Sequence, residues 1–152
     1  MIEVKRIYAV DAWCVDCKRC EVACKTAHSS SKDTVKAYMC ETCPEPRVRV
    51  EGDKDVSFAV NCRHCAQPLC VEGCISGAMA KDPVTGVVTS DPEKCVACGT
   101  CVSMCPFGAV HIETVAIKCD VCGDGAGQPG TPACVLACPN RALVYVESEV
   151  KL

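Results

Sequence analysis

The cysteine spacing in one short stretch, CVACGTCVSMCP from Cys95 to Pro106, strongly constrains how this chain can fold. Its four cysteines are separated by two, two and three residues and are followed directly by a proline. A loop with two-residue gaps can place three sulfur atoms around one metal centre, whereas a cysteine on the short helix that follows points away from that centre. We therefore expect Cys105 to bind a neighbouring centre.

The same pattern recurs along the chain. Sixteen of the eighteen cysteines fall into four groups of four, and each group opens with a two-residue gap and closes with a three-residue gap. The groups are Cys14, Cys17, Cys20 and Cys24; Cys62, Cys65, Cys70 and Cys74; Cys95, Cys98, Cys101 and Cys105; and Cys119, Cys122, Cys134 and Cys138. After groups two, three and four the chain reads CISGAM, CPFGAV and CPNRAL, whereas group one ends in CKTAHS and is the most divergent copy.

The cysteine content and the N-terminus both favour metal binding. Cysteine makes up about 12% of the 152 residues, above the ~8–10% that marks a disulfide scaffold or a metal protein. The segment MIEVKRIYAVDAW has no apolar signal region and no twin arginine, and no stretch approaches the ~20 apolar residues of a membrane span. We expect a cytoplasmic protein without a membrane span, whose C-x2-C pairs are metal ligands.

Zinc and iron–sulfur clusters both bind such cysteine pairs. Zinc uses two pairs separated by a longer spacer, and the C-x2-C-x3-C continuation would leave odd ligands over. The spacing is that of two-cluster ferredoxins, in which the last cysteine of each motif binds the other cluster. Four groups therefore predict four [4Fe–4S] clusters in two cross-linked pairs. Each oxidised cluster with its thiolates carries about −2, so the formal charge of −3 becomes roughly −11, and we expect no nucleic-acid partner.

Short strands and short helices predict an α+β fold. Strands are expected at 6–10, 47–51, 56–60, 86–90, 110–113, 115–118 and 142–146. Brief helices should follow the third cysteine of each group, and KDPVTGVV should form a hairpin-like turn. Only 20 residues separate groups two and three, which suits a bacterial-ferredoxin-like unit at 62–105. Groups one and four would form a second unit from 1–61 plus 106–152 around it, so we expect 1–152 to be one polyferredoxin domain of two nested units.

Four ferredoxin motifs in this order resemble those of a known family. With CRHCAQPLCVEGC as the second motif and the long gap in the fourth, the chain is similar to the four-cluster iron–sulfur subunits of the dimethyl sulfoxide reductase and formate dehydrogenase families. CKRCEVACKTAHSSSKD and CPEPRVRVEG resemble more closely the small iron–sulfur subunit associated with carbon monoxide dehydrogenase. Similar subunits serve formate dehydrogenases, hydrogenases and tungsten aldehyde oxidoreductases. The resemblance covers almost the whole chain.

The resemblance also implies which cysteines share a cluster, because the family pairs group one with group four and group two with group three. The implied ligand sets are Cys14, Cys17, Cys20 and Cys138; Cys24, Cys119, Cys122 and Cys134; Cys62, Cys65, Cys70 and Cys105; and Cys74, Cys95, Cys98 and Cys101. Cys24 and Cys74 lack the proline that usually follows the last cysteine, although this removes no ligand.

A non-catalytic electron-transfer role follows from the resemblance. The family passes single low-potential electrons along a row of clusters, between a catalytic oxidoreductase subunit and an acceptor protein, and no catalytic motif is visible in this chain. An iron–sulfur redox sensor is the alternative class, but the sequence has no DNA-binding or signalling segment. Without a C-terminal membrane anchor we expect a soluble complex. Clusters near both ends would also allow association into a homo-oligomer or a filament.

Some residues outside the four groups also merit an interpretation. Cys40 and Cys43 form a fifth C-x2-C pair, for which free thiols and a metal site shared across a symmetric dimer both stay open. GAGQPG at 125–130 matches a dinucleotide fingerprint, but no strand directly precedes it, so we expect no nucleotide there. His64 could ligate iron, yet its group already has four cysteines, which favours a hydrogen-bonding or surface role. Trp13 should pack near a cluster.

Overall fold

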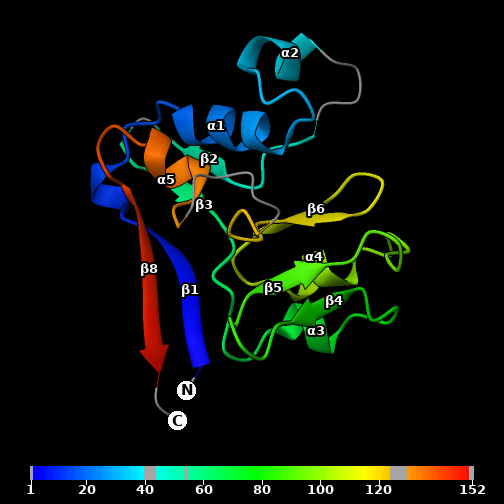
Figure 1. Ribbon diagram of the computed structural model, residues 1–152. Coiled ribbons are helices and arrows are strands. Elements are labelled where there is room, and N and C mark those ends of the chain that lie inside the picture. The colour runs from blue at the N-terminus through cyan, green and yellow to red at the C-terminus, as the bar shows by residue number, and fades with distance from the viewer. Residues whose placement is uncertain (1, 40–43, 54, 124–129, 151–152) are drawn as a thin grey trace.

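Four two-stranded antiparallel sheets and several short helices make up the computed structural model, which describes residues 2–39, 44–53, 55–123 and 130–150 (Figure 1). In chain order the elements are β1 (Ile2–Ala9), the short helix η1 (Asp11–Trp13), α1 (Arg19–His28), α2 (Thr34–Met39), β2 (Arg49–Gly52), β3 (Ser57–Val60), α3 (Leu69–Glu72), β4 (Met79–Lys81), β5 (Val88–Ser90), α4 (Thr100–Met104), β6 (Val110–Ile112), β7 (Ala116–Lys118), α5 (Ala133–Ala137) and β8 (Leu143–Val150). A small mixed fold of this kind agrees with the predicted α+β class.

The first and last strands pair with each other. β1 and β8 run antiparallel with a register from Ile2 opposite Val150 to Ala9 opposite Leu143, and they lie side by side as the blue and red arrows of Figure 1. Lys5 and Glu147 stand opposite each other and form an ion pair of 2.8 Å, which adds to the cross-strand pairing. Because group one follows β1 and group four precedes β8, this strand pair brings the two most distant cysteine groups together.

Two pairs of helices carry the cysteine groups. α1 packs against α5 and holds cysteines of groups one and four, whereas α3 packs against α4 and holds cysteines of groups two and three. In Figure 1 the pair α1 and α5 lies at the upper left and the pair α3 and α4 at the lower right. The hairpin of β6 and β7 contacts α4 and β5, and so lies against the part of the chain that carries groups two and three.

The predicted helices form, but their starting point differs from the prediction. Each begins one residue before the third cysteine instead of after it, so that Cys20, Cys70, Cys101 and Cys134 lie within the first turn. Pro68 and Pro132 stand directly before α3 and α5, where a proline is tolerated because the first helical N–H groups have no partner in the helix. In group one the helix continues past Cys24 to His28, which is why the CKTAHS tail departs from the others.

Three elements were absent from the sequence prediction, namely η1, α2 and β4. α2 is six residues long, and β4 consists of Met79, Ala80 and Lys81, which have no strong strand preference. β4 exists because the KDPVTGVV turn folds it back on β5, with Met79 opposite Ser90. The hairpin-like turn is therefore confirmed, while its first strand was missed.

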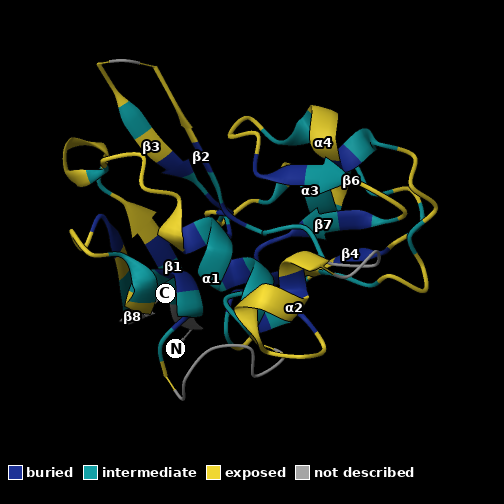
Figure 2. Cartoon of the chain, turned by 90° about the horizontal axis from the view of Figure 1, so that it is seen from above, coloured by how far each residue is buried: buried dark blue, intermediate teal, exposed yellow. Residues whose placement is uncertain are grey.

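Cysteine supplies a large share of the buried core. The larger cluster of buried residues has eleven members, of which five are cysteines, namely Cys20, Cys24, Cys62, Cys119 and Cys134. A smaller one joins Met79, Cys101, Val110 and Ala116. Figure 2 shows the buried positions, in dark blue, along the inner parts of α1, β1 and the strands near α3 and α4. Packing in this protein therefore depends on the groups that the cysteine side chains bind.

Candidate metal centres

All four cysteine groups share one unusual backbone conformation. The second residue between the first and second cysteines has a positive φ in every group, at Asp16 (52°), His64 (44°), Ala97 (54°) and Val121 (60°). Positive φ is uncommon for residues other than glycine, and for a β-branched valine it is an outlier. Strained conformations of this kind gather at functional sites, where surrounding interactions hold them in place. The sequence repeat is therefore also a repeat of loop geometry.

The repeated tail after the fourth cysteine also has a structural cause. Its third residue, Gly77, Gly108 or Arg141, has φ of 67°, 61° or 56°, and its N–H donates to the carbonyl of the preceding cysteine at 3.2, 3.4 or 3.4 Å. The alanine that follows is buried in all three copies. This turn directs the chain away from the cysteine and into β4, β6 or β8, which explains why glycine recurs in the motif.

Arg141 stands in this turn at a position that favours glycine. We expect Arg141→Gly to stabilise the protein by about 0.5–1 kcal/mol, because relief of the left-handed strain exceeds the added entropy of the unfolded chain. The thermal midpoint of the anaerobic holoprotein should rise by roughly 2–4 °C for each kcal/mol. The reciprocal control is Gly108→Ala, since a Cβ there meets no atom within 4 Å and tests the backbone alone. A lower midpoint for Arg141→Gly, or a higher one for Gly108→Ala, would contradict this reading of the turn.

Two of the four implied ligand sets line cavities of their own. Cys14, Cys17 and Cys20 line one cavity together with Cys138, which is far away in sequence. Cys95, Cys98 and Cys101 line another together with Cys74. In each case three cysteines of one group meet the last cysteine of a different group.

The other two sets are brought together in more buried surroundings. Burial raises the pKa of the Cys70 thiol, and the neighbouring Cys62, Cys105 and Cys65 raise this pKa further. Burial likewise raises the pKa of Cys134, with further contributions from Cys119, Cys24 and Cys122. The structure thus brings cysteines of different groups close to one another, in the two cavities and around Cys70 and Cys134. Cys40 and Cys43 lie outside the described residues, as does all of GAGQPG except Gly130.

Backbone N–H groups point at sulfur atoms in every group. They belong to Arg47 on Cys24 (3.2 Å), His64 on Cys62 (3.4 Å), Met79 on Cys74 (3.4 Å), Ala116 on Cys95 (3.3 Å), Val121 on Cys119 (3.4 Å) and Ala142 on Cys138 (3.1 Å). A hydrogen bond donated to sulfur favours the thiolate over the thiol. The same donors tune the reduction potential of a cluster held by these sulfurs.

Burial acts in the opposite direction on several of these thiols. It raises the pKa of Cys20 and of Cys119 to about 12, so both are protonated at neutral pH unless a metal takes the place of the proton. No three His, Cys, Asp or Glu side chains in the described ranges are grouped so that they could hold a single metal ion. Cysteines that surround a cavity in fours fit a larger group with several metal ions.

A charged network that sequence reasoning missed holds the surroundings of Cys24. Asp120 forms ion pairs with Arg47 and with His28 Nε2, the latter at 3.5 Å, and His28 Nδ1 lies 2.8 Å from the Cys24 carbonyl. Burial alone would lower the pKa of His28, but hydrogen bonds with Asp120 and Cys24 raise it to about 10. The network ties α1 to the loop of group four. Its members are scattered in sequence, so only the spatial arrangement reveals it.

His64 and Trp13 have the kinds of role that the sequence suggested. His64 is 1% exposed, and its Nδ1 accepts a hydrogen bond of 2.9 Å from the N–H of Val88. Burial lowers the pKa of His64 to about 3, so the ring is neutral. Trp13 borders the cavity of Cys14 and Cys17 but is half exposed, so it packs at the rim.

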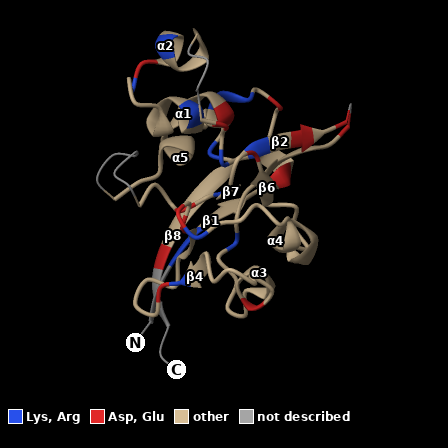
Figure 3. Cartoon of the chain, turned by 90° about the vertical axis from the view of Figure 1, so that its right-hand side faces the viewer, with Lys and Arg blue, Asp and Glu red and all other residues tan. Residues whose placement is uncertain are grey.

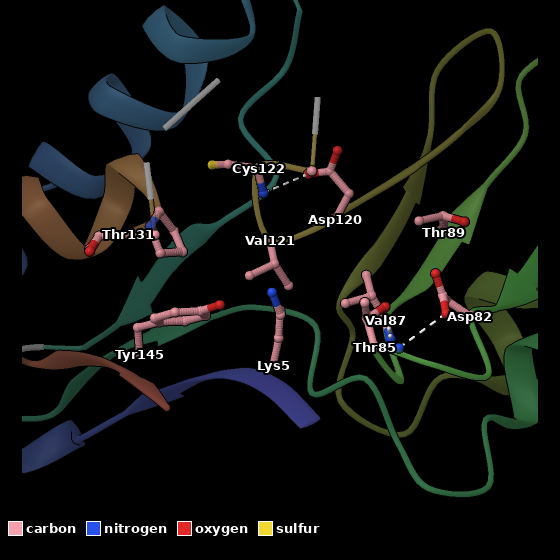
Figure 4. A pocket seen from close by; sticks show the side chains of 13 residues that line it. Lys5, Asp82, Thr85, Val87, Thr89, Asp120, Val121, Cys122, Thr131 and Tyr145 are labelled. Carbon is pink, nitrogen blue, oxygen red and sulfur yellow. Dashed lines mark hydrogen bonds between the residues drawn. The ribbon is translucent and has the colours of Figure 1, made fainter. Parts of the chain in front are cut away.

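An open cavity of about 490 Å³ reaches Cys122 from the surface. Figure 4 shows Lys5 and Tyr145 of the paired strands β1 and β8 on one side of it and Thr85 and Asp82 of the β4–β5 turn on the other. The N–H of Cys122 donates to Asp120 at 3.2 Å (Figure 4).

Cysteines in sets of four, with strained loops around them and N–H donors on their sulfurs, define an iron–sulfur protein. A family model for the 4Fe-4S dicluster domain matches residues 54–148, which include groups two, three and four. The chain belongs to this family. This membership confirms that its cofactors are [4Fe–4S] clusters. Zinc, the other metal that such cysteine pairs bind, is therefore the wrong alternative.

Relatives and solved structures agree with this family. A protein of Rhodospirillum rubrum named "Iron-sulfur protein" is 33% identical over 156 residues, with 93% of this chain and 81% of the relative covered. "Electron transport protein HydN" of Escherichia coli (strain K12) is 32% identical over 155 residues, with 88% and 83% covered. A chain of "Active site complex BamBC of Benzoyl Coenzyme A reductase as isolated" matches with a TM-score of 0.52 and 27% identity, covering 98% of this chain and 80% of that one.

These findings confirm the family resemblance at the level of iron–sulfur proteins. None of the names concerns carbon monoxide dehydrogenase, and the family description mentions two clusters and not four. Within the described residues no helix is long and apolar enough to cross a membrane.

Proposed function

We propose that this chain is an electron-transfer subunit that holds four [4Fe–4S] clusters, with the ligand sets that the resemblance implies. The observation that carries the proposal is the cavity that Cys138 shares with Cys14, Cys17 and Cys20. A last cysteine more than a hundred positions away completes the set, as the cross-ligation rule of two-cluster ferredoxins requires.

[4Fe–4S] clusters supply reversible one-electron oxidation and reduction at potentials set by their surroundings. The chain supplies those surroundings. Its cysteines anchor each cluster, its backbone N–H groups bond to the ligand sulfurs, and its hydrophobic residues limit the access of water. The residues of this chain bind no substrate in the proposal, so catalysis belongs to a partner.

The sets at the two ends of the row are the ones that partners can approach. Cys17 and Cys98 are exposed, whereas the other fourteen cysteines in the four groups are buried or half-buried. An exposed valine lies two residues before each of them, namely Val15 before Cys17 and Val96 before Cys98, exposed by 61% and 63%. Figure 3 adds that α3 and α4, next to the Cys98 end, carry few charges. We propose that these two faces are the entry and exit points for electrons.

A catalytic oxidoreductase subunit is the proposed partner at one face. Carbon monoxide dehydrogenase is our first candidate, and formate dehydrogenase, hydrogenase and aldehyde oxidoreductase are the others, with a second protein as electron acceptor. An electron-transfer role fits the name of HydN as an electron transport protein, and we propose that this subunit is cytoplasmic and non-catalytic. A redox sensor is the alternative class.

We also propose the nested arrangement of units. The pairing of β1 with β8 and the packing of α1 on α5 support an outer unit made from both ends of the chain. Contacts of β6 and β7 with α4 and β5 favour an inner unit that extends from residue 62 to the end of β7, beyond the boundary at 105.

Mixing the oxidised protein anaerobically with each candidate enzyme and its substrate tests the proposed role. We expect the visible absorbance to bleach with one enzyme, and none of CO, formate or hydrogen to bleach the protein alone. Val15→Asp or Val96→Asp should slow the enzymatic bleaching at least tenfold, about 1.4 kcal/mol, since a charge in an apolar contact must be desolvated. Reduction by dithionite is the control and should not change. Turnover of any substrate by the protein alone would contradict the proposal.

A further inference from the structure

Lys118 is a buried lysine in a core that is rich in cysteine. It is the last residue of β7, lies directly before Cys119, and is only 4% exposed. Its Nζ donates to the carbonyl oxygens of Val88 and of Cys119, the latter at 2.7 Å. Both acceptors are neutral, so they satisfy N–H groups of the ammonium without balancing its charge. A buried ammonium is costly unless negative charge lies near it.

The contacts of Lys118 place it between two ligand sets. On one side its own backbone continues into Cys119, which belongs to the set with Cys24, Cys122 and Cys134. On the other side Val88 accepts from Lys118 and donates its N–H to His64, which lies between Cys62 and Cys65. Lys118 and His64 therefore bind the carbonyl and the N–H of one residue of β5, which belong to two successive peptide groups. Burial raises the pKa of Cys70 and of Cys119, and the charge of Lys118 opposes this in both cases.

Among the residues that the structure describes, no salt bridge includes the Lys118 ammonium. Asp120 lies two residues along but is engaged by Arg47 and His28. His64 is neutral and adds no charge of its own. The thiolate-bound clusters of the two sets would each bring about −2 and supply the missing negative charge.

We propose that Lys118 is a fixed positive charge between the cluster of Cys62, Cys65, Cys70 and Cys105 and the cluster of Cys24, Cys119, Cys122 and Cys134. It raises the reduction potentials of these two inner clusters of the row relative to the two outer clusters, which include Cys17 and Cys98. Reduction adds one electron and makes a cluster more negative, so a nearby cation stabilises the reduced form more than the oxidised form. The electron comes from the external reductant, and the step involves no proton transfer. The inference rests on the proposed function, since it needs four clusters with these ligand sets.

The chain provides a matched control for Lys118. Lys94 also stands directly before the first cysteine of a group, namely Cys95, but its side chain is 64% exposed and pairs with Asp91 at 3.2 Å. Water and salt screen a charge at such a position. Removal of Lys94 should therefore change the potentials far less than removal of Lys118, although both lysines precede a cysteine.

Anaerobic redox titration followed by electron paramagnetic resonance, with the iron content of each variant, tests the inference. Native protein with four reducible clusters is the starting requirement, and a smaller number counts against the proposed function and not against the role of Lys118. In Lys118→Met the equilibrium constant for reduction of two of the four clusters should fall at least tenfold, which is about 59 mV for a one-electron couple. Lys94→Met and Lys118→Arg should change all four constants less than threefold.

Each remaining outcome decides the question. Unchanged potentials in Lys118→Met, or an equal shift of all four clusters, would overturn the inference. Loss of two clusters from Lys118→Met and Lys118→Gln, with all four kept at native potentials in Lys118→Arg, would show that the protein needs the positive charge to hold those two clusters. That result would support the inference. If Lys118→Arg loses the same clusters, Lys118 acts through its shape and the inference is wrong.

Discussion

Replacement of Cys105 by alanine should remove one whole cluster and take the holoprotein from about sixteen to about twelve iron ions. Cys105 follows three cysteines of group three, but the pKa of Cys70 responds to Cys105 together with Cys62 and Cys65. The cluster lost should therefore be the one anchored by group two. Ser103→Ala, two positions away on α4, is the matched control and should keep all the iron.

Double variants identify the partner cysteines of Cys105. Cys105→Ala combined with Cys62→Ala should retain about twelve iron ions, because both changes affect one cluster. Cys105→Ala combined with Cys95→Ala should retain about eight, because two clusters are affected. Iron and acid-labile sulfide on anaerobically purified protein measure both. The reverse order, with the Cys95 combination keeping more iron, would show that Cys105 serves its own group.

Removal of iron by a strong chelator should unfold most of the chain. Five of the eleven members of the larger core cluster are cysteines, so without clusters these positions hold thiols around cavities. Binding of a structural metal supplies about 10–16 kcal/mol in small zinc domains, as much as the ~5–15 kcal/mol by which whole domains are stable. Far-ultraviolet circular dichroism should lose most of its strand and helix signal as the visible absorbance disappears.

A reconstitution control separates chelation from simple chemical damage. Readdition of iron, sulfide and a thiol reductant under anaerobic conditions should restore both signals together, because cluster binding and folding are one process in this account. A chelated protein that keeps its circular dichroism and a sharp thermal transition would contradict it, since the core would then be stable without clusters.

The sequence predicts the cysteine groups well because ligand spacing reports local loop geometry. The hairpin between β4 and β5 follows from Pro83 and Gly86, and the strands rich in valine and isoleucine lie close to their predicted places. β4 was missed because Met79, Ala80 and Lys81 form a strand only through their pairing with β5. Each helix begins one residue before the third cysteine and not after it, so its predicted start was at least two residues too late.

Other features depend on contacts between remote residues. The positive φ that Val121 shares with Asp16, His64 and Ala97 is known only from the folded loops, because these four residue types have nothing in common in the sequence. Asp120, Arg47 and His28 come from three separate segments, and no spacing rule connects them. Lys118 had a weak signal, because a lysine ending an apolar strand directly before a cysteine suggests burial, but Lys94 before Cys95 is exposed.

Native mass spectrometry of the anaerobically purified protein tests the central claim most directly. The account predicts one chain carrying about sixteen iron and sixteen sulfide ions, that is, four [4Fe–4S] clusters. A chain that carries about eight iron ions, the content of two clusters, or zinc in place of iron, would contradict it.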